Sequence, residues 1–573
     1  MATLEQRIAA ARGDLACDLV LRGGKLVDVL AGEIYEADVA VFDGQVIGIG
    51  EDYAGEAELD CRDRWIAPAF IDGHMHVESS LVTLPEFARA VLPRGTATVV
   101  LDPHEIANVH GAEGIRYILD SRRGLPLRAF VMASSCVPAT HMETAGAELS
   151  VADLVELLEE DGVIGLAEMM NFPGVVYGDP GVLAKLEAAR ERGVIIDGHA
   201  PGLAGRHLNA YAIGGPGSDH ECTTLEEANE KLRRGLRIMV REASTARNLE
   251  TLLPLIDERN ERRCCFVTDD RHPSDLIAEG HIDHCVRKAI SLGLDPMIAW
   301  RMATQNPAEW FGLDRIGLGA IAPGRRADLL VLADLDSVAI EKVFVDGQLI
   351  ATDGRLEVEL PEAPTTLPPS VHVDLDRFSG FAIPAEGEEI RVIEVIPGQI
   401  VTGHATAMAS VRDGEAVADP ERDLCKIAVV ERHGRRGSVG LGFVRGFGLG
   451  SGAIASSVGH DSHNIVIAGA DDPSMWRALE EVVGLGGGLV VSSATEVLAS
   501  LALPIAGLMS DLSLQEVRSA LDRLHAAYHD LGGGLDDAFM SLSFLALPVI
   551  PSLKITDHGL VDVERFEVVP LWV

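Results

Sequence analysis

Short apolar runs alternate with longer amphipathic segments between about residues 66 and 310. Runs of strand length lie at 98–101, 129–133 and 163–167. Segments with apolar residues at helical spacing lie at 150–160, 183–192 and 225–234. Regular alternation of strand and helix over this length predicts a (β/α)8 TIM-like barrel, in which the C-terminal ends of the strands share one face.

Two segments outside the barrel resemble one another. They are 41–47 and 344–350, β-rich runs that both turn at Asp-Gly, a strong hairpin signal. We therefore expect residues 15–65 and 318–360 to pair in a composite β-sandwich. The barrel is then inserted into this sandwich as residues 66–317.

A proline-rich bridge over 361–369 predicts a separate C-terminal α+β domain at 370–573. Within that domain, 485–489 and 531–535 both read Leu-Gly-Gly-Gly-Leu, and a Leu-Ala-Leu-Pro run follows each of them. This repetition predicts a duplicated α+β unit.

Residues of the kinds that bind metals stand at the ends of the apolar runs. His74 and His76 are one residue apart, so in an extended segment their side chains leave the same face. An isolated His-x-His pair is common, but later runs end in further ligand types, namely Glu168, His199, His220 and Asp269. Imidazoles and carboxylates suit iron, manganese or zinc, so the six residues together predict a metal site.

Each of these residues has a simpler explanation when it is taken alone. Taken singly, Glu168 is better read as a hydrogen-bonded carboxylate at a strand end, and His199 or His220 as a buried histidine bonded to backbone. Those explanations do not account for the recurrence of such residues at successive strand ends. A shared ligand accounts for that recurrence.

Five stretches carry longer patterns, at 72–80, 102–109, 165–171, 197–202 and 268–273. They resemble the bacterial and archaeal adenine deaminases of the amidohydrolase superfamily, and the likeness runs along almost the whole chain. The resemblance implies metal-dependent hydrolytic deamination of adenine to hypoxanthine and ammonia. It also implies that His74, His76, Glu168, His199, His220 and Asp269 are the metal ligands.

Glu168 stands where many members of the superfamily carry a carbamylated lysine that bridges two metals. A carboxylate has two oxygens and can bridge two cations in the same way. The substitution agrees with the adenine deaminase subgroup and disfavours the hydantoinase and dihydroorotase types. We therefore expect two divalent ions per subunit, with manganese or iron preferred and zinc as the alternative.

Asp269 is the expected proton shuttle, taking a proton from the attacking water and giving one to the departing ammonia. Asp270 is its rival for this catalytic role. Consecutive side chains of a strand diverge, so only one of the two is expected among the metal ligands. The other is expected to bond Arg271 or loop backbone.

Five further residues are expected to contact the substrate, namely His104, Glu105, Ser134, Cys136 and His460. Each has an alternative. His104 and Glu105 are equally suited to cap the following helix, and Ser134 and Cys136 are small polar residues in a tight loop. The segment 459–464, which holds His460, either lines the barrel mouth, binds metal or forms a polar turn.

The composition of the chain limits its possible partners and cellular location. The chain has 48 Lys and Arg against 88 Asp and Glu, a formal net charge of −40, which disfavours nucleic acid as a partner. Eight cysteines without a Cys-x-x-Cys pattern suit a reducing compartment, and 1–13 has no signal-peptide core, so a cytoplasmic location is expected. Glycines and a proline interrupt the apolar stretch 484–509, so we expect no membrane association. The length of the chain and its outer surfaces suggest a homodimer.

Two other functions stay open at this stage. One is hydrolysis of another cyclic amide or aminated heterocycle, which the barrel patterns equally allow. The other is a catalytically silent amidohydrolase-like scaffold, since fold does not fix activity. The complete set of six ligand-type residues argues against the silent scaffold.

Overall fold

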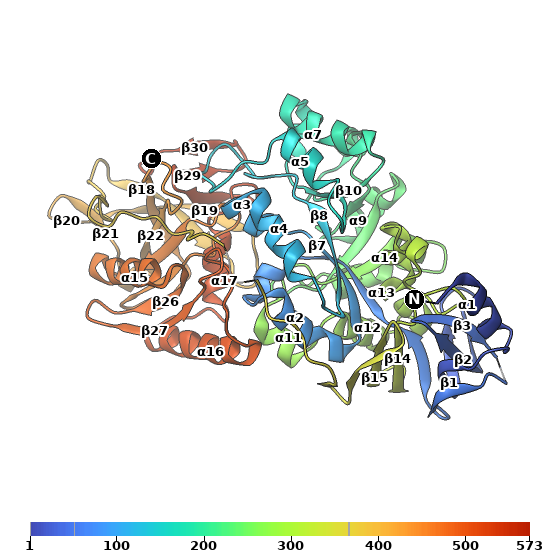
Figure 1. Ribbon diagram of the computed structural model, residues 1–573. Helices are drawn as coiled ribbons and strands as arrows, with labels where there is room; N and C mark the ends of the chain where they lie inside the picture. The colour runs from blue at the N-terminus through green and yellow to red at the C-terminus, as the bar shows by residue number, and fades with distance from the viewer. Residues whose placement is uncertain (1, 51, 365–366) are drawn as a thin grey trace.

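The computed structural model describes residues 2–50, 52–364 and 367–573. Three parts lie in a row, with the barrel between an N-terminal sheet and the C-terminal domain (Figure 1). The C-terminal domain is therefore in position to cover one end of the barrel.

Eight strands form the barrel. They are β6 (Phe70–Met75), β7 (Thr96–Leu101), β8 (Arg128–Ala133), β9 (Val163–Met169), β10 (Ile195–Gly198), β11 (Ser218–Asp219), β12 (Arg237–Arg241) and β13 (Cys264–Val267). Strands β6 to β10 pair in a parallel five-stranded sheet and β11 to β13 in a parallel three-stranded one. A backbone bridge between Met75 and Asp269 joins the two sheets on one side. The predicted barrel is present, with its strands divided between two hydrogen-bonded sheets.

Helices alternate with these strands. They include α4 (Ala112–Ser121), α5 (Val151–Leu157), α7 (Pro180–Glu191), α8 (Gly205–Gly214), α9 (Leu225–Arg233), α12 (Ile282–Ser291) and α13 (Pro296–Ala303). The three helices expected from periodicity are α5, α7 and α9. Capping side chains at Ser150, Asp179 and Thr224 begin them, each accepting a hydrogen bond from the first turn.

Strands from both ends of the barrel segment share one sheet. Its nine strands are β1 (Cys17–Asp28), β2 (Glu33–Phe42), β3 (Gln45–Ile49), β4 (Gly55–Asp60), β5 (Trp65–Pro68), β14 (Leu329–Asp334), β15 (Ala339–Val345), β16 (Gln348–Thr352) and β17 (Arg355–Leu356). Both Asp-Gly pairs turn hairpins with positive φ at each residue, 49° and 78° at Asp43 and Gly44 and 49° and 72° at Asp346 and Gly347.

The C-terminal domain is built on an eight-stranded sheet. Its strands are β18 (Glu389–Val395), β19 (Thr402–Met408), β22 (Leu424–Val430), β23 (Val439–Arg445), β24 (Ala453–Ser456), β25 (Ile465–Gly469), β26 (Gly488–Ser492) and β27 (Val497–Ala502). Three helices accompany it, α15 (Asp472–Leu485), α16 (Leu514–Asp530) and α17 (Ala538–Phe544). The domain also contains a three-stranded sheet of β28 (Leu553–Thr556), β29 (Gly559–Asp562) and β30 (Glu567–Val569).

The expected duplication within this domain is wrong. After the first Leu-Gly-Gly-Gly-Leu the chain forms the hairpin of β26 and β27, whereas after the second it forms helix α17. The difference is local. β-branched Val490 and Val491 extend the first copy, while Asp537 in the second accepts a hydrogen bond from Met540 N and caps a helix.

Two further predictions concern membrane-spanning helices and the cysteines. Across the described residues, no helix is both long enough and apolar enough to cross a membrane. All eight cysteines are buried and free, in keeping with thiols that have no covalent role.

Candidate metal centre

His74 and His76 leave the end of strand β6 into the interior of the barrel mouth, where both are buried. The Nδ1 atom of His74 lies 3.1 Å from Asp197 Oδ2, and Nδ1 of His76 lies 2.8 Å from the carbonyl oxygen of Asp102. Both acceptors require a proton on Nδ1. Each imidazole therefore presents its Nε2 lone pair to the cluster, as a metal ligand must.

Glu168, at the end of strand β9, lies at the centre of the cluster. Its Oε1 atom is 3.5 Å from His76 Nε2 and 3.8 Å from His74 Nε2. Its Oε2 atom is 2.5 Å from His199 Nδ1 and 3.3 Å from His220 Nε2. The two oxygens thus face different imidazoles, which is the arrangement expected of a bridging carboxylate.

Charge reinforces this arrangement. Burial raises the pKa of the Glu168 carboxyl, but His199 and His220 beside it overcome that effect and hold the pKa well below its usual range. Burial likewise lowers the pKa of His199, while the Glu168 carboxylate raises it to about 9 overall. Glu168 is therefore ionised and available to cations.

The adjacent residues Asp269 and Asp270 make different contacts. Asp269 Oδ1 lies 3.1 Å from His76 Nε2, and its backbone has φ of 54°, a left-handed conformation that Asp tolerates. Asp270 instead accepts a hydrogen bond from the Ser79 hydroxyl. The structure therefore places Asp269, and not Asp270, among the imidazoles. The expected bond from Asp270 to Arg271 is not made, because Arg271 donates to Gly280 O and Glu242 O.

Buried polar atoms at this centre test whether it suits a metal. Among the described residues, His74 Nε2, His199 Nδ1 and Glu168 Oε2 have no aligned hydrogen-bond partner. Ligand atoms of His74, Glu168 and His220 lie within 4.8 Å of one another, as do those of His74, His76 and Asp269. Such donor sets of imidazole nitrogens and carboxylate oxygens fit divalent cations.

Sequence reasoning missed three participants, Asp102, Glu221 and Arg241. Arg241 Nη1 lies 2.8 Å from Asp269 Oδ2, and the same guanidinium bonds the Glu221 carboxylate. Asp102 forms a ligand-type group with His76, His104 and Glu168. All three stand at strand ends or next to a predicted ligand, a signal that was present in the sequence and not used.

His104 and Glu105 begin helix α3 (His104–His110), but neither caps it. The first turn is capped from outside, since Ile106 N donates to Glu78 Oε1 at 3.1 Å. His104 instead spans two groups, with Nδ1 3.6 Å from Glu168 Oε1 and Nε2 3.2 Å from Glu105 Oε1. The capping alternative is therefore wrong.

Glu105 contacts two histidines of the C-terminal domain. Its Oε1 atom lies 2.7 Å from His460 Nδ1, and its Oε2 contacts His463 Nε2. The segment 459–464 thus reaches the barrel mouth. Ser134 and Cys136 do not line the site cavity: Ser134 Oγ bonds Asp102 Oδ1 at 3.3 Å, and Cys136 Sγ accepts from Asn171 N at 3.4 Å.

A small cavity opens onto the cluster, and both domains line it. The barrel contributes the imidazoles, carboxylates and Met170, while the C-terminal domain contributes His460 and an apolar wall of Ile400, Phe544, Leu547 and Ile550. Lys554 Nζ donates to Ile400 O at 2.8 Å and Phe544 O at 3.0 Å, which ties two parts of this wall together. A cavity with an apolar wall and polar groups at one end is typical of a site for a small ligand.

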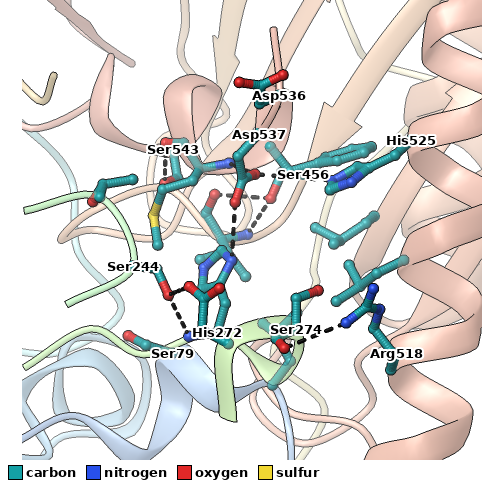
Figure 2. A pocket seen from close by; sticks show the side chains of 18 of the residues that line it. Ser79, Ser244, His272, Ser274, Ser456, Arg518, His525, Asp536, Asp537 and Ser543 are labelled. Carbon is teal, nitrogen blue, oxygen red and sulfur yellow. Dashed lines mark hydrogen bonds and ion pairs between the residues drawn. The ribbon is translucent and has the colours of Figure 1, made fainter. Parts of the chain in front are cut away.

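A second cavity lies at the same domain boundary (Figure 2). His460 is among the residues that line it. Its walls hold a cross-domain pair in which His272 Nδ1 lies 3.1 Å from Asp537 Oδ2. His525 lies on the same side as Asp537, on helix α16. The cations lining this cavity are paired with carboxylates, Arg518 with Asp522 and Arg247 with Asp275.

An eight-stranded α/β barrel with a buried imidazole and carboxylate cluster at its strand ends defines a hydrolase of the metal-binding barrel class. Residues 65–350 match the amidohydrolase family, and residues 399–567 match the adenine deaminase C-terminal domain. The adenine deaminase of Desulfatibacillum aliphaticivorans is 50% identical over 99% of both chains. That of Methanothrix thermoacetophila is 51% identical over 99% of both chains. This chain therefore belongs to the adenine deaminase family of the amidohydrolase superfamily.

Proposed function

We propose that this protein hydrolyses adenine to hypoxanthine and ammonia. The observation that carries the proposal is the complete cluster of six ligand-type residues in a chain that matches adenine deaminases from end to end. A silent scaffold has no need of a buried carboxylate surrounded by five imidazoles. The cavity has an apolar wall opposite the cluster, and such a wall suits the face of a purine base.

The proposed metal ligands are His74, His76, Glu168, His199, His220 and Asp269. When bound, divalent cations at such a centre supply Lewis-acid activation of a water molecule near neutral pH. Manganese or iron is our preference for the native ion, with two ions per subunit. The expected setting is a cytoplasmic homodimer that acts in purine salvage.

Asp269 is placed to move protons. Its Oδ1 faces the cluster beside His76, while Arg241 holds Oδ2 at 2.8 Å. The carboxylate accepts a proton from the attacking water and later delivers one to the amine nitrogen that leaves C6. Arg241 fixes the carboxylate for both transfers, because a guanidinium remains protonated throughout.

The test is turnover of adenine by purified protein freed of metal and reloaded separately with manganese, ferrous iron or zinc. Loss of adenine absorbance together with release of ammonia is the expected result, and adenosine and dihydroorotate serve as comparison substrates. Absence of adenine turnover by folded protein that has bound metal would contradict the proposal and favour another cyclic substrate.

A further inference from the structure

Four buried polar side chains meet where the barrel touches the C-terminal domain. His104 and Glu105 come from the start of helix α3, and His460 and Asp461 come from the segment between β24 and β25. None of the four is more than 4% exposed. We call them the boundary cluster. Each domain supplies one imidazole and one carboxylate, and none of the four is among the six predicted metal ligands.

The polar atoms of the boundary cluster lie at distances that one metal ion would span. Glu105 Oε1 is 2.7 Å from His460 Nδ1 and 3.2 Å from His104 Nε2. Asp461 Oδ1 is 3.8 Å from each of the same two nitrogens. Ligand atoms that are about 2.0–2.2 Å from one ion stand about 3.0–3.6 Å from one another. The measured distances bracket this range.

Asp461 is the residue that points most directly to a bound ion. Its side chain is buried, and Oδ2 has no hydrogen-bond partner in residues 2–50, 52–364 and 367–573. Its Oδ1 faces two imidazole nitrogens, but 3.8 Å is too long for a hydrogen bond to either. A buried carboxylate is costly unless it is paired or coordinates a metal. A cation inside the boundary cluster supplies what this carboxylate lacks.

His104 presents a lone pair to the boundary cluster. Its Nδ1 atom lies 3.4 Å from Asp102 Oδ2 and 3.6 Å from Glu168 Oε1. Ionised carboxylates only accept hydrogen bonds, so the proton of this imidazole belongs on Nδ1 and Nε2 is left with its lone pair. A histidine that binds metal typically directs its other ring N–H at a carboxylate in the same way.

Neighbouring contacts orient the other two ligands. The ring of His460 stacks on Phe544, with ring centres 4.5 Å apart and planes 16° apart. The Oε2 atom of Glu105 contacts His463 Nε2. Gly459 N donates to His463 Nδ1 at 3.3 Å, so His463 carries its proton on Nε2 and turns that proton toward Glu105. Oε1 is therefore the oxygen of Glu105 that is left for an ion.

From this geometry we propose that the boundary cluster binds one divalent transition-metal ion, through His104 Nε2, Glu105 Oε1, His460 Nδ1 and Asp461 Oδ1. The two carboxylates balance its charge, and a set of imidazoles and carboxylates suits zinc, manganese or ferrous iron. This ion is additional to those of the six-residue metal centre. Because both domains supply ligands, it fastens the C-terminal domain to the barrel mouth. The proposal goes beyond the proposed function and does not depend on the substrate.

Protonated histidines are the competing explanation. A proton on His460 Nδ1 or on His104 Nε2 would satisfy Glu105, whose Oε1 lies within 3.2 Å of both atoms. Neither proton would form a hydrogen bond with Asp461 across 3.8 Å. Protonation therefore leaves this carboxylate unpaired, whereas an ion at the centre of the cluster contacts it directly.

The test counts the zinc ions bound by the full-length protein. Metal-free protein is loaded with zinc, freed of excess ion and measured by mass spectrometry, and circular dichroism checks that each variant is folded. Asp461→Asn keeps the size of the side chain and removes its charge. Asp557→Asn is the matched control, because Asp557 is also buried at the domain boundary but accepts hydrogen bonds from Thr144 N at 2.9 Å and Ser438 Oγ at 2.6 Å.

Wild type is expected to bind one more zinc ion per subunit than Asp461→Asn, and as many as Asp557→Asn. Glu168→Gln weakens the six-residue metal centre, so in that background the ion of the boundary cluster is the one retained. Zinc should then raise the melting temperature of Glu168→Gln but not that of the double variant Glu168→Gln/Asp461→Asn. Crystals of zinc-loaded wild type should show an anomalous scattering peak among the four side chains.

Equal zinc content in wild type and folded Asp461→Asn would overturn the proposal. So would anomalous peaks confined to the six-residue metal centre. Should Asp461→Asn fail to fold, His460→Phe takes its place, since it keeps the ring that stacks on Phe544 but has no ligand nitrogen, and the same loss of one ion is expected. The zinc count is read without adenine, so a failure of adenine turnover refutes the proposed function alone.

Discussion

Replacement of Glu168 by glutamine is the sharpest test of the bridging role. The amide has the shape of the carboxylate but lacks its charge, and one of its two terminal atoms becomes a donor. In the structure Oε1 faces His74 and His76 while Oε2 faces His199 and His220, so either amide orientation turns an NH2 group toward one set of imidazoles. A cation bound at this centre then loses an anionic ligand.

The size of the effect follows from the burial of the cluster. Removing one partner of a buried charge pair costs about 3–5 kcal/mol. At about 1.36 kcal/mol per factor of ten, metal affinity is expected to fall by about 10²- to 10⁴-fold. Glu168→Gln should therefore lose metal and turnover together, with little change in the surrounding packing.

The assay is metal titration of the metal-free protein, read as bound metal by mass spectrometry and as kcat/KM for adenine. Glu242→Gln is the matched control, since Glu242 is another buried glutamate that pairs with Lys288 and does not line the site cavity. It is expected to keep both metal and activity. A Glu168→Gln protein that binds metal with wild-type affinity, or that is fully active, would refute the bridging assignment.

Three further outcomes are expected. Asp269→Asn should retain more metal than Glu168→Gln yet lose about 10²- to 10⁴-fold in kcat, measured at full metal loading. Parallel loss of bound metal and kcat would contradict the role of Asp269 as proton shuttle. Burial lowers the pKa of Lys554 to about 7 from 10.5. The free energy of unfolding of the wild type, measured with urea, should therefore rise by about 5 kcal/mol between pH 7 and pH 10.5. Lys554→Met should show no such rise. Burial raises the pKa of Asp537, but His272 brings it to about 2, so the pair stabilises the fold above pH 4 and weakens as pH falls toward 2. Asp537→Asn should then lose less melting temperature than wild type between pH 5 and pH 3, and equal losses would show that the pair contributes nothing.

Periodicity in the sequence was sufficient for the architecture. Strand-length runs and amphipathic segments predicted the barrel, and the Asp-Gly turns predicted both hairpins of the N-terminal sheet. The predicted duplication in the C-terminal domain failed because two similar glycine-rich stretches precede residues of opposite local preference. A similar loop sequence does not determine whether a strand or a helix follows it.

The order of the strands along the sequence was also sufficient to predict the candidate metal-binding residues. Parallel strands of a barrel bring their C-terminal ends to one face, so ligand-type residues at those ends, from His74 to Asp269, were expected to meet, and the structure places them together. That expectation requires only the order of strands along the chain.

The tertiary structure decided which side chains face each other. Asp269, rather than Asp270, joins the imidazoles, and its backbone, two residues after β13, is left-handed. Arg241 and Glu221 stand at a strand end or beside a predicted ligand in the sequence, and the structure shows that Arg241 pairs with both Glu221 and Asp269 across the mouth. His460 meets Glu105 across 355 residues of sequence. Such contacts depend on how strand ends rotate and how the C-terminal domain packs on the barrel, and neither is encoded in a local pattern of residues.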